Sequence, residues 1–309
     1  MFFFKPKFWD KNQISVFSIL LFPISLLIKL VSFFKLIFIK KYNFSVPVIC
    51  VGNIYLGGTG KTPFCIELFS ILKSLNKNPA FIKKKYNSFK DEFNLLKIRG
   101  PVFESKKRKN AINEAIKNNS DVVILDDGFQ DFSIEKNLSI ICFNSNQLIG
   151  NGLAIPSGPL REGLSSLSRA NLVIINGKKD LNFEKKILEK NKEIKIFYLN
   201  YELLNIDEIK NNKILAFAGI GNPINFFNML KEKGLDLHKE ISFPDHYNYS
   251  QKELENLISM AKNNNAILLT TEKDYLRIEE NYRKNIFYIK IKIKIENKDK
   301  LIQEIKKII

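Results

Sequence analysis

The segment PVICVGNIYLGGTGKTP, residues 47–63, joins an apolar stretch to a glycine-rich turn and to the start of a helix-forming sequence. Residues 48–51 are typical of a buried strand, and residues 62–75 have the apolar spacing of a helix. In such a turn successive backbone N–H groups point inward, beside the positive end of the helix dipole, and so favour a bound polyphosphate. The residues that we expect to hold a nucleotide's phosphates are Gly57, Gly58, Thr59, Gly60, Lys61 and Thr62.

Two side chains of this loop have predicted roles. Lys61 is expected to reach the β- and γ-phosphates, and Thr62 to offer its hydroxyl to Mg²⁺. The strict pattern G-x-x-x-x-G-K-[ST] fails at Tyr55, which stands where the first glycine belongs, so this is a variant loop. The alternative is a glycine-rich turn that only connects a strand to a helix.

A second motif, VVILDDGFQ at residues 122–130, is an apolar strand that ends in two carboxylates. In a nucleotide-binding sheet this is the place of the aspartate that holds Mg²⁺. Carboxylates are hard oxygen ligands, and Mg²⁺ bound to a phosphate commonly takes only one or two of them. We therefore assign Asp126 and Asp127 to the metal, with a plain Asp-Asp-Gly turn as the alternative.

Composition limits the class of protein. A chain of 309 residues is long enough for two modest domains, each with its own core. The net charge of +17 comes overwhelmingly from lysine, and no nucleic-acid-binding signature accompanies it, so we expect no nucleic acid partner. The three cysteines lie in apolar segments without C-x-x-C spacing and indicate core residues in a reducing compartment: Cys50, Cys65 and Cys142.

The N-terminal part, residues 1–45, raises the question of a membrane. The apolar run at residues 14–39 is interrupted by Lys29, Lys35 and Pro23, so no clean span of about 20 residues is available. We expect one helix or two half-helices in the membrane interface; the alternative is a core helix whose polar stripe faces solvent. The stripe comprises Lys11, Ser15, Ser18, Ser25, Lys29, Ser32 and Lys40. The expected aromatic anchors are Phe2, Phe3, Phe4, Phe8 and Trp9.

The remaining sequence predicts an α/β fold. Residues 46–208 alternate strand and helix, which indicates a mostly parallel, P-loop NTPase-like sheet flanked by helices. Residues 209–295 indicate a second, smaller α/β domain, in which residues 250–253 form a capping-box pattern. Residues 286–295 alternate as one half-exposed strand, and the helix at residues 296–309 is expected to pack back on the first domain.

Two further segments carry polar residues with less certain roles. In PSGPLREG, residues 156–163, Arg161 and Glu162 are adjacent opposite charges that could be solvated and idle. In FPDHY, residues 243–247, His246 is one of only two histidines in the chain. Taken alone, it is more typical of a surface or capping histidine than of a catalytic one.

Seven motifs together resemble one family, tetraacyldisaccharide 4′-kinase, the lipid A 4′-kinase. They occur in the family's order: PVICVGNIYLGGTGKTP, ILDDGFQ, GNG, PSGPLRE, FAGIGNP, FPDHY and TTEKD. The resemblance implies transfer of the γ-phosphate of ATP, with Mg²⁺, to the 4′-hydroxyl of a lipid A disaccharide 1-phosphate in lipopolysaccharide biosynthesis. It also implies a peripheral or monotopic enzyme, which we expect to be a monomer, on the cytoplasmic face of the inner membrane. Its two domains would be joined by two strands.

The resemblance also assigns residues. Glu162 matches a glutamate near the metal, and the acid of the family's GDEP matches Asp91. Asp91 and His246 pair in the family as the catalytic base, which suits a sugar hydroxyl because a histidine held by a carboxylate can accept its proton. Since we place these two residues in different domains, the resemblance requires the domains to close.

The chain departs from the family's pattern in two motifs, and two other classes of protein are alternatives to it. The family's SRGYG is KKKYN at residues 83–87, with Lys84 in the place of the arginine, and GDEP is KDEF at residues 90–93. A membrane-associated partitioning ATPase is the main alternative function, but that class usually carries a lysine where this chain has Leu56. A nucleic-acid-binding protein has only the charge in its favour.

Overall fold

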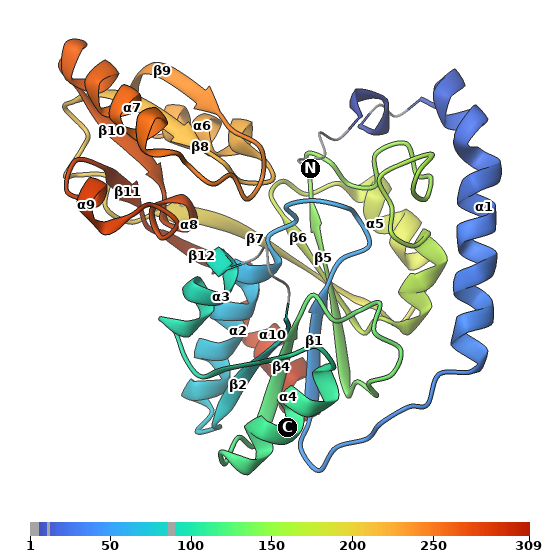
Figure 1. Cartoon of the computed structure of the whole chain (residues 1–309). Helices are drawn as coiled ribbons and strands as arrows, with labels where there is room; N and C mark the ends of the chain where they lie inside the picture. The colour runs from blue at the N-terminus through green and yellow to red at the C-terminus, as the bar shows by residue number, and fades with distance from the viewer. Residues whose placement is uncertain (1–5, 11–12, 86–89) are drawn as a thin grey trace. The chain divides into compact units, whose positions relative to one another are not determined.

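The computed structural model describes residues 6–10, 13–85 and 90–309, and omits the side chains of residues 32–33, 35–37 and 90–91 (Figure 1). The chain divides into two compact units. The larger contains the described residues up to 85, Arg99–Asn200 and Ile293–Ile309; the smaller contains residues 90–98 and Tyr201–Lys292.

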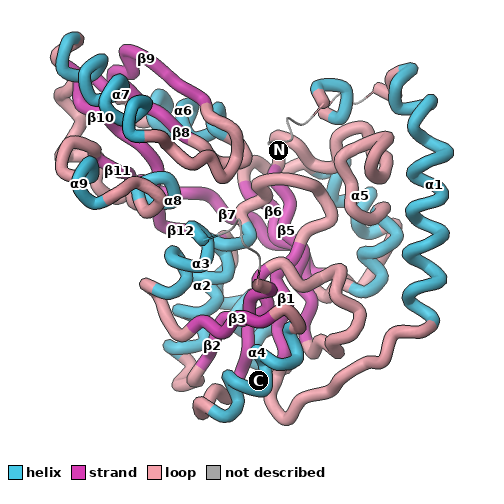
Figure 2. Tube along the Cα trace, viewed as in Figure 1, coloured by secondary structure: helices cyan, strands magenta, loops and turns pink. Residues whose placement is uncertain are grey.

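An eight-stranded sheet forms the larger unit, in the order β12-β7-β6-β5-β1-β4-β2-β3 (Figure 2). The pairs that join β1 through β7 are parallel, and β1 lies between β4 and β5. The carboxyl ends of β1, β4 and β2 therefore meet at one edge of the sheet, where open α/β sheets bind ligands. The strands are β1 Val48–Gly52, β2 Pro79–Lys84, β3 Val102–Ser105, β4 Val122–Asp126, β5 Leu138–Asn144, β6 Leu172–Asn176, β7 Lys195–Leu203 and β12 Ile291–Ile295.

Helices cover both faces of this sheet. On one face α4 and α5 share a continuous core with alternate residues of the strands. On the other, α2 packs on β1, β2 and β4, and Glu67 of α2 accepts a hydrogen bond from Lys298 of α10 at 2.6 Å. The C-terminal helix thus belongs to the larger unit. The helices are η1 Lys7–Trp9, α1 Val16–Ile37, α2 Lys61–Ser74, α4 Arg108–Lys117, η2 Leu164–Arg169, α5 Leu181–Leu188 and α10 Lys298–Lys306.

The smaller unit has a parallel four-stranded sheet in the order β11-β10-β8-β9. Two separate cores flank it, one under α6 and the other under α7. The predicted capping box is present, because Ser250 and Glu253 exchange hydrogen bonds at the start of α7. The elements are α3 Lys90–Lys97, β8 Lys213–Ala218, α6 Pro223–Glu232, β9 Asp236–Ser242, α7 Gln251–Asn263, β10 Ala266–Thr271, α8 Glu272–Tyr275, α9 Glu280–Arg283 and β11 Phe287–Ile289.

The division differs from the expected one in two places. The helix that carries Asp91 belongs to the same unit as His246, whereas the sequence was divided so as to place them in different domains. The single strand expected at residues 286–295 is two strands in two sheets. It breaks at Lys290, whose N–H donates to the Asn205 side chain and whose carbonyl accepts from Leu204, so these groups leave the ladder.

Helix α1 is continuous through Pro23 rather than split into two half-helices (Figure 1). Ser18 and Ser25 of this helix face the protein. The Ser25 hydroxyl hydrogen-bonds to Ser157 at 2.8 Å and donates to the Ala154 carbonyl, and the Asn151 amide donates to Ser18. The alternative of a core helix with its polar stripe toward solvent is therefore contradicted, because the apolar side is the exposed one. Exposed apolar side chains of α1 include Val16, Phe17, Ile19, Leu20, Ile24, Leu26, Leu27, Leu30 and Val31.

The aromatic anchors differ from expectation at Trp9. It is buried, and its indole N–H donates to the carbonyl of Pro156 at 3.1 Å, so it fastens the N-terminal segment to the protein instead of facing lipid. Phe2, Phe3 and Phe4 lie outside the described residues. Among the helices that are described, none is both long and apolar enough to cross a membrane.

Candidate functional site

The glycine-rich loop leads from β1 to α2 and is shaped by its own side chains. Gly57 and Gly60 have φ of +135° and +89°, a region that residues with a Cβ rarely enter. The buried Asn53 amide donates to the carbonyls of Tyr55, at 2.6 Å, and Gly57, at 3.3 Å, and to the Thr59 hydroxyl. This one side chain therefore ties together three points of the loop that is expected to hold phosphates.

Tyr55, the residue that breaks the strict pattern, is fully buried and has a structural role. Its hydroxyl donates to the Asp10 carboxylate at 2.5 Å. Its neighbours bind the segment that carries Arg161: the Arg161 N–H donates to the Ile54 carbonyl, and the Leu56 N–H donates to Pro159. Residues from other segments thus anchor the loop around position 55, where the strict pattern has a glycine.

Asp126 ends β4 and is nearly inaccessible to solvent. Its Oδ2 lies 2.6 Å from the Lys83 Nζ and 3.5 Å from the Thr62 hydroxyl, and its Oδ1 lies 3.8 Å from the Cys65 thiol. Burial, reinforced by the Asp126 charge, raises the pKa of the Cys65 thiol well above its usual value, so the thiol keeps its proton and can donate. Asp126 and Thr62, predicted as neighbours, are brought together.

Asp127 has different partners although it is adjacent in sequence. Arg161 Nη1 lies 2.9 Å from both of its carboxylate oxygens, and Lys61 Nζ lies 4.0 Å from one of them. The guanidinium of Arg108 donates to its carbonyl at 2.7 Å. Arg161, which the sequence left as possibly idle, therefore fixes the second aspartate beside the phosphate-loop lysine.

Glu162 forms an ion pair with Arg169, whose guanidinium lies over the rings of Phe129 and Phe132. The other oxygen of Glu162, Oε1, is buried and has no hydrogen-bond partner in the described part of the chain. Glu162 is therefore held in place while one of its oxygens stays available, but its ion pair is separate from those of Asp126 and Asp127.

The predicted metal set was Thr62, Asp126, Asp127 and Glu162. Across residues 6–10, 13–85 and 90–309, no three His, Cys, Asp or Glu side chains are grouped so as to hold a metal ion. Thr62 and Asp126 present two hard oxygens 3.5 Å apart, which fits Mg²⁺ of the kind whose remaining ligands are phosphate and water. Of the predicted set, Thr62 and Asp126 are thus the two residues that the structure brings together.

In the smaller unit, His246 belongs to a partly buried polar cluster. Its Nε2 lies 3.8 Å from a carboxylate oxygen of Glu92 and 3.8 Å from one of Asp245. Lys273 Nζ lies 3.3 Å from Glu92 and 3.7 Å from Asp245. The Asp91 side chain, predicted as the partner of His246, lies outside the described residues. Sequence reasoning missed Glu92 and Lys273, although they belong to the quoted motifs KDEF and TTEKD.

The backbone around His246 is held by Arg277, which pairs with Asp274, the last residue of the TTEKD motif. His246 has φ of +58°, and its N–H donates to the Gly219 carbonyl. Arg277 donates to the carbonyls of Gly219 and Tyr247, and it also pairs with the fully buried Asp274 at 3.1 Å. The left-handed turn that presents the imidazole is therefore fixed by a buried ion pair.

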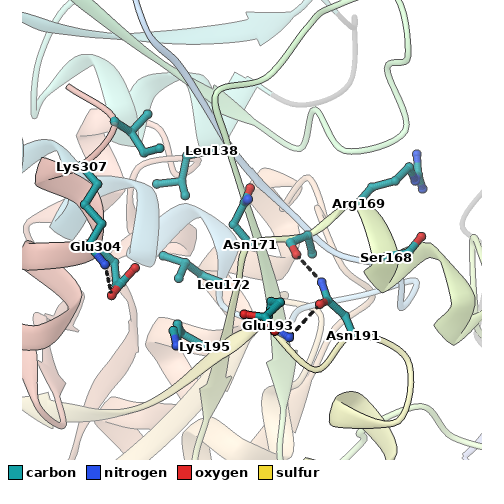
Figure 3. Close-up of a pocket in the computed structure, with 12 residues that line it drawn as sticks. Leu138, Ser168, Arg169, Asn171, Leu172, Asn191, Glu193, Lys195, Glu304 and Lys307 are labelled. Atoms are coloured by element: carbon teal, nitrogen blue, oxygen red, sulfur yellow. Dashed lines mark hydrogen bonds and ion pairs between the residues drawn. The ribbon is translucent and has the colours of Figure 1, made fainter.

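A cavity of about 300 Å³ lies elsewhere in the larger unit (Figure 3). It is lined by Leu138, Leu172 and Lys195, the first residues of β5, β6 and β7, together with Glu304 of α10 and Lys307, which follows that helix. The phosphate loop instead follows the end of β1, so this cavity is not part of the expected nucleotide site.

Comparison with known proteins decides the family. A sequence model described as tetraacyldisaccharide-1-P 4′-kinase matches residues 17–309. The chain belongs to this family. A tetraacyldisaccharide 4′-kinase of Pelagibacter ubique is 43% identical over 310 residues, with 98% of each chain covered. The enzyme of that name from Rickettsia canadensis is 36% identical, with 97% of this chain and 96% of that one covered.

A solved structure agrees with these relatives. The "apo" form of the Aquifex aeolicus family member, crystallised in complex with ATP, is 26% identical, with a TM-score of 0.73 over 94% of this chain and 99% of that one. The predicted family, the P-loop α/β fold and the activity of an ATP-dependent kinase of lipid A biosynthesis are thereby confirmed.

We expect Tyr55→Phe to lower the free energy of unfolding by about 1–2 kcal/mol, because it removes the hydrogen bond that anchors the glycine-rich loop to Asp10. Urea denaturation in detergent, followed by circular dichroism, measures the change. The matched control is Tyr282→Phe, which removes a hydroxyl that bonds to exposed Glu255 and should change stability by less than about 0.5 kcal/mol. Equal effects of the two substitutions would contradict the anchoring role.

Proposed function

We propose that the chain transfers the γ-phosphate of ATP to the 4′-hydroxyl of a lipid A disaccharide 1-phosphate, with Mg²⁺ held by Thr62 and Asp126. The observation that carries this proposal is the approach of the loop's Thr62 to the buried Asp126 at the carboxyl edge of the sheet, 3.5 Å apart, in a chain of this family. Membership of the family supports the reaction, and the contact between Thr62 and Asp126 supports the choice of these two residues.

The nucleotide half of the site rests on charge and backbone. Backbone N–H groups of residues 57–62 and the N-terminus of α2 favour the phosphates. Lys61 and Arg161, both beside Asp127, are placed to neutralise charge on the transferred phosphoryl group. A bound Mg²⁺ would supply further neutralisation of the phosphate oxygens. ATP is the nucleotide because the Aquifex aeolicus family member was crystallised with it.

The acceptor half rests on His246. A neutral imidazole beside the carboxylates of Glu92 and Asp245 can accept the proton of a sugar hydroxyl, because the carboxylates stabilise the imidazolium that results. Lys273 partly offsets these two negative charges and holds Glu92 in place. Asp91 remains the partner that the family resemblance assigns, and Glu92 is added to it as a positioning residue.

Helix α1 supports a location at the cytoplasmic face of the inner membrane. Ser18 and Ser25 are bound to residues 151–157, so the described apolar side chains of α1 from Val16 to Val31 are left to face outward. An apolar helix face of this kind fits a helix that lies in the interface and brings the enzyme to its lipid substrate. We propose a peripheral or monotopic monomer.

The test of the activity is transfer of labelled phosphate from ATP, with Mg²⁺, to a lipid A disaccharide 1-phosphate in mixed micelles. We expect labelled lipid from the unaltered chain and a loss of at least about 100-fold in Lys61→Ala, which removes a phosphate-site charge. Lys73→Ala, an exposed lysine of the same helix, is the control and should keep full activity. If Lys61→Ala still labelled the lipid at the level of the unaltered chain, a role of the loop in the reaction would be refuted.

For the base, we expect His246→Ala to lower kcat by about 10²–10⁴-fold and Glu92→Gln by about tenfold, with ATP affinity retained in both. Glu255→Gln, which alters an exposed carboxylate of α7, should have no effect. Single-turnover kinetics and calorimetric ATP titration separate the two quantities. Loss of ATP affinity in either variant would show that the cluster serves nucleotide binding instead.

For the membrane, we expect the triple substitution Phe17→Ser, Leu20→Ser and Leu27→Ser to move the protein from sedimenting vesicles to the supernatant, since each side chain is more than half exposed on α1. The matched control replaces Leu181 and Ile224, which are exposed apolar residues of other helices, with serine. Sedimentation of the triple variant with vesicles at the unaltered level would point to a different anchor.

A further inference from the structure

Lys83 is a buried lysine in β2, one residue before that strand ends at Lys84. The pairing of β2 with β4 sets Ile82 opposite Leu125, so the next residues, Lys83 and Asp126, fall side by side. The Lys83 side chain is 8% exposed, and its Nζ lies 2.6 Å from Asp126 Oδ2. Burying an ammonium group is costly unless a carboxylate compensates for its charge. Asp126 supplies that carboxylate to Lys83.

The same carboxylate oxygen faces the expected metal position. Asp126 Oδ2 is the atom that lies 3.5 Å from the Thr62 hydroxyl, and it is also the atom that Lys83 contacts. A divalent cation on this oxygen would lie close to the ammonium, and two cations on one buried oxygen repel each other strongly. The metal and Lys83 therefore compete for Asp126 Oδ2 in this geometry.

The carboxylate of Asp127 does not replace that of Asp126 as a partner for Mg²⁺ or for Lys83. Asp127 is engaged by Arg161 at 2.9 Å and lies 4.0 Å from Lys61. The two aspartates thus face three positive side chains, those of Lys61, Lys83 and Arg161, which disfavours the entry of a further cation. A triphosphate changes the balance, because its oxygens can accept hydrogen bonds from an ammonium that leaves Asp126.

We propose that Lys83 is a positioning residue that holds Asp126 in the nucleotide-free enzyme and competes with Mg²⁺ for it, so that the metal enters only together with the nucleotide. This inference rests on the proposed Mg²⁺ site at Thr62 and Asp126. Its consequence is that metal and ATP bind as a unit, with the ammonium passing from the carboxylate to a phosphate oxygen as the metal arrives.

The experiment measures Mn²⁺ binding by electron paramagnetic resonance, with and without a non-hydrolysable ATP analogue. Without nucleotide, we expect Lys83→Ser to bind Mn²⁺ about tenfold or more tightly than the unaltered chain, because the competing ammonium is gone. Serine is also the residue that the family's SRGYG motif carries at this position. Lys83→Arg, which keeps the charge, should retain the weak binding.

The control is Lys85→Ser, which removes an exposed lysine that pairs with Glu104 outside the site and should leave Mn²⁺ binding unchanged. Loss of a buried ion-pair partner can destabilise the fold, so Lys83→Gln, whose amide can still donate to Asp126, is tested in parallel. Melting temperatures in detergent give a second readout: Mn²⁺ alone should raise that of Lys83→Ser more than that of the unaltered chain.

The outcomes distinguish this inference from the proposed metal site. If Lys83→Ser and Lys83→Gln bind Mn²⁺ without nucleotide no more tightly than the unaltered chain, while that chain binds Mn²⁺ with the analogue, the competition is refuted and the metal site stands. If the unaltered chain fails to bind Mn²⁺ even with the analogue, the proposed metal site itself is refuted.

Discussion

One buried carboxylate, that of Asp126, connects the elements at which we propose the nucleotide site. It ends β4, pairs with Lys83 at the end of β2, and approaches Thr62 in the first turn of α2. These contacts depend on the strand order, which sets β4 between β1 and β2 with parallel registers. Because a buried carboxylate is stable only with compensating partners, the pairing also constrains how the three elements meet.

The glycine-rich loop and helix α1 are held by hydrogen bonds to one another's neighbouring segments. Asp10 accepts the Tyr55 hydroxyl, Trp9 donates to Pro156, and Ser25 bonds to Ser157. The segment at residues 151–161 lies between them, since it also bonds to Ile54 and Leu56 of the loop. The apolar face of α1 and the nucleotide loop thus share one rigid support, which suits an enzyme that acts on a lipid.

The sequence predicted those features that depend on local patterns. The strand, glycine turn and helix around Lys61, the aspartates after β4 and the capping box at Ser250 each follow from spacing within a short window. The residues that make up the family's motifs were likewise sufficient to indicate the fold and the activity. Local chemistry of this kind is independent of the order of the strands.

Other features required the three-dimensional arrangement. The contact of Lys83 with Asp126 depends on the pairing of strands that are 43 residues apart, which no local pattern gives. A helical wheel shows that α1 has a polar side but not whether that side meets protein or solvent. Alternation at residues 286–295 continues through Lys290, although the backbone there leaves the sheet to bond with Asn205 and Leu204.

A crystal structure of the chain with Mg²⁺ and a non-hydrolysable ATP analogue tests the central claim most directly. We predict the phosphates on residues 57–62, the metal between the Thr62 hydroxyl and Asp126, and the Lys83 ammonium moved from Asp126 to a phosphate oxygen. A nucleotide bound at the cavity beside α10, or a metal that does not contact Asp126, would contradict it.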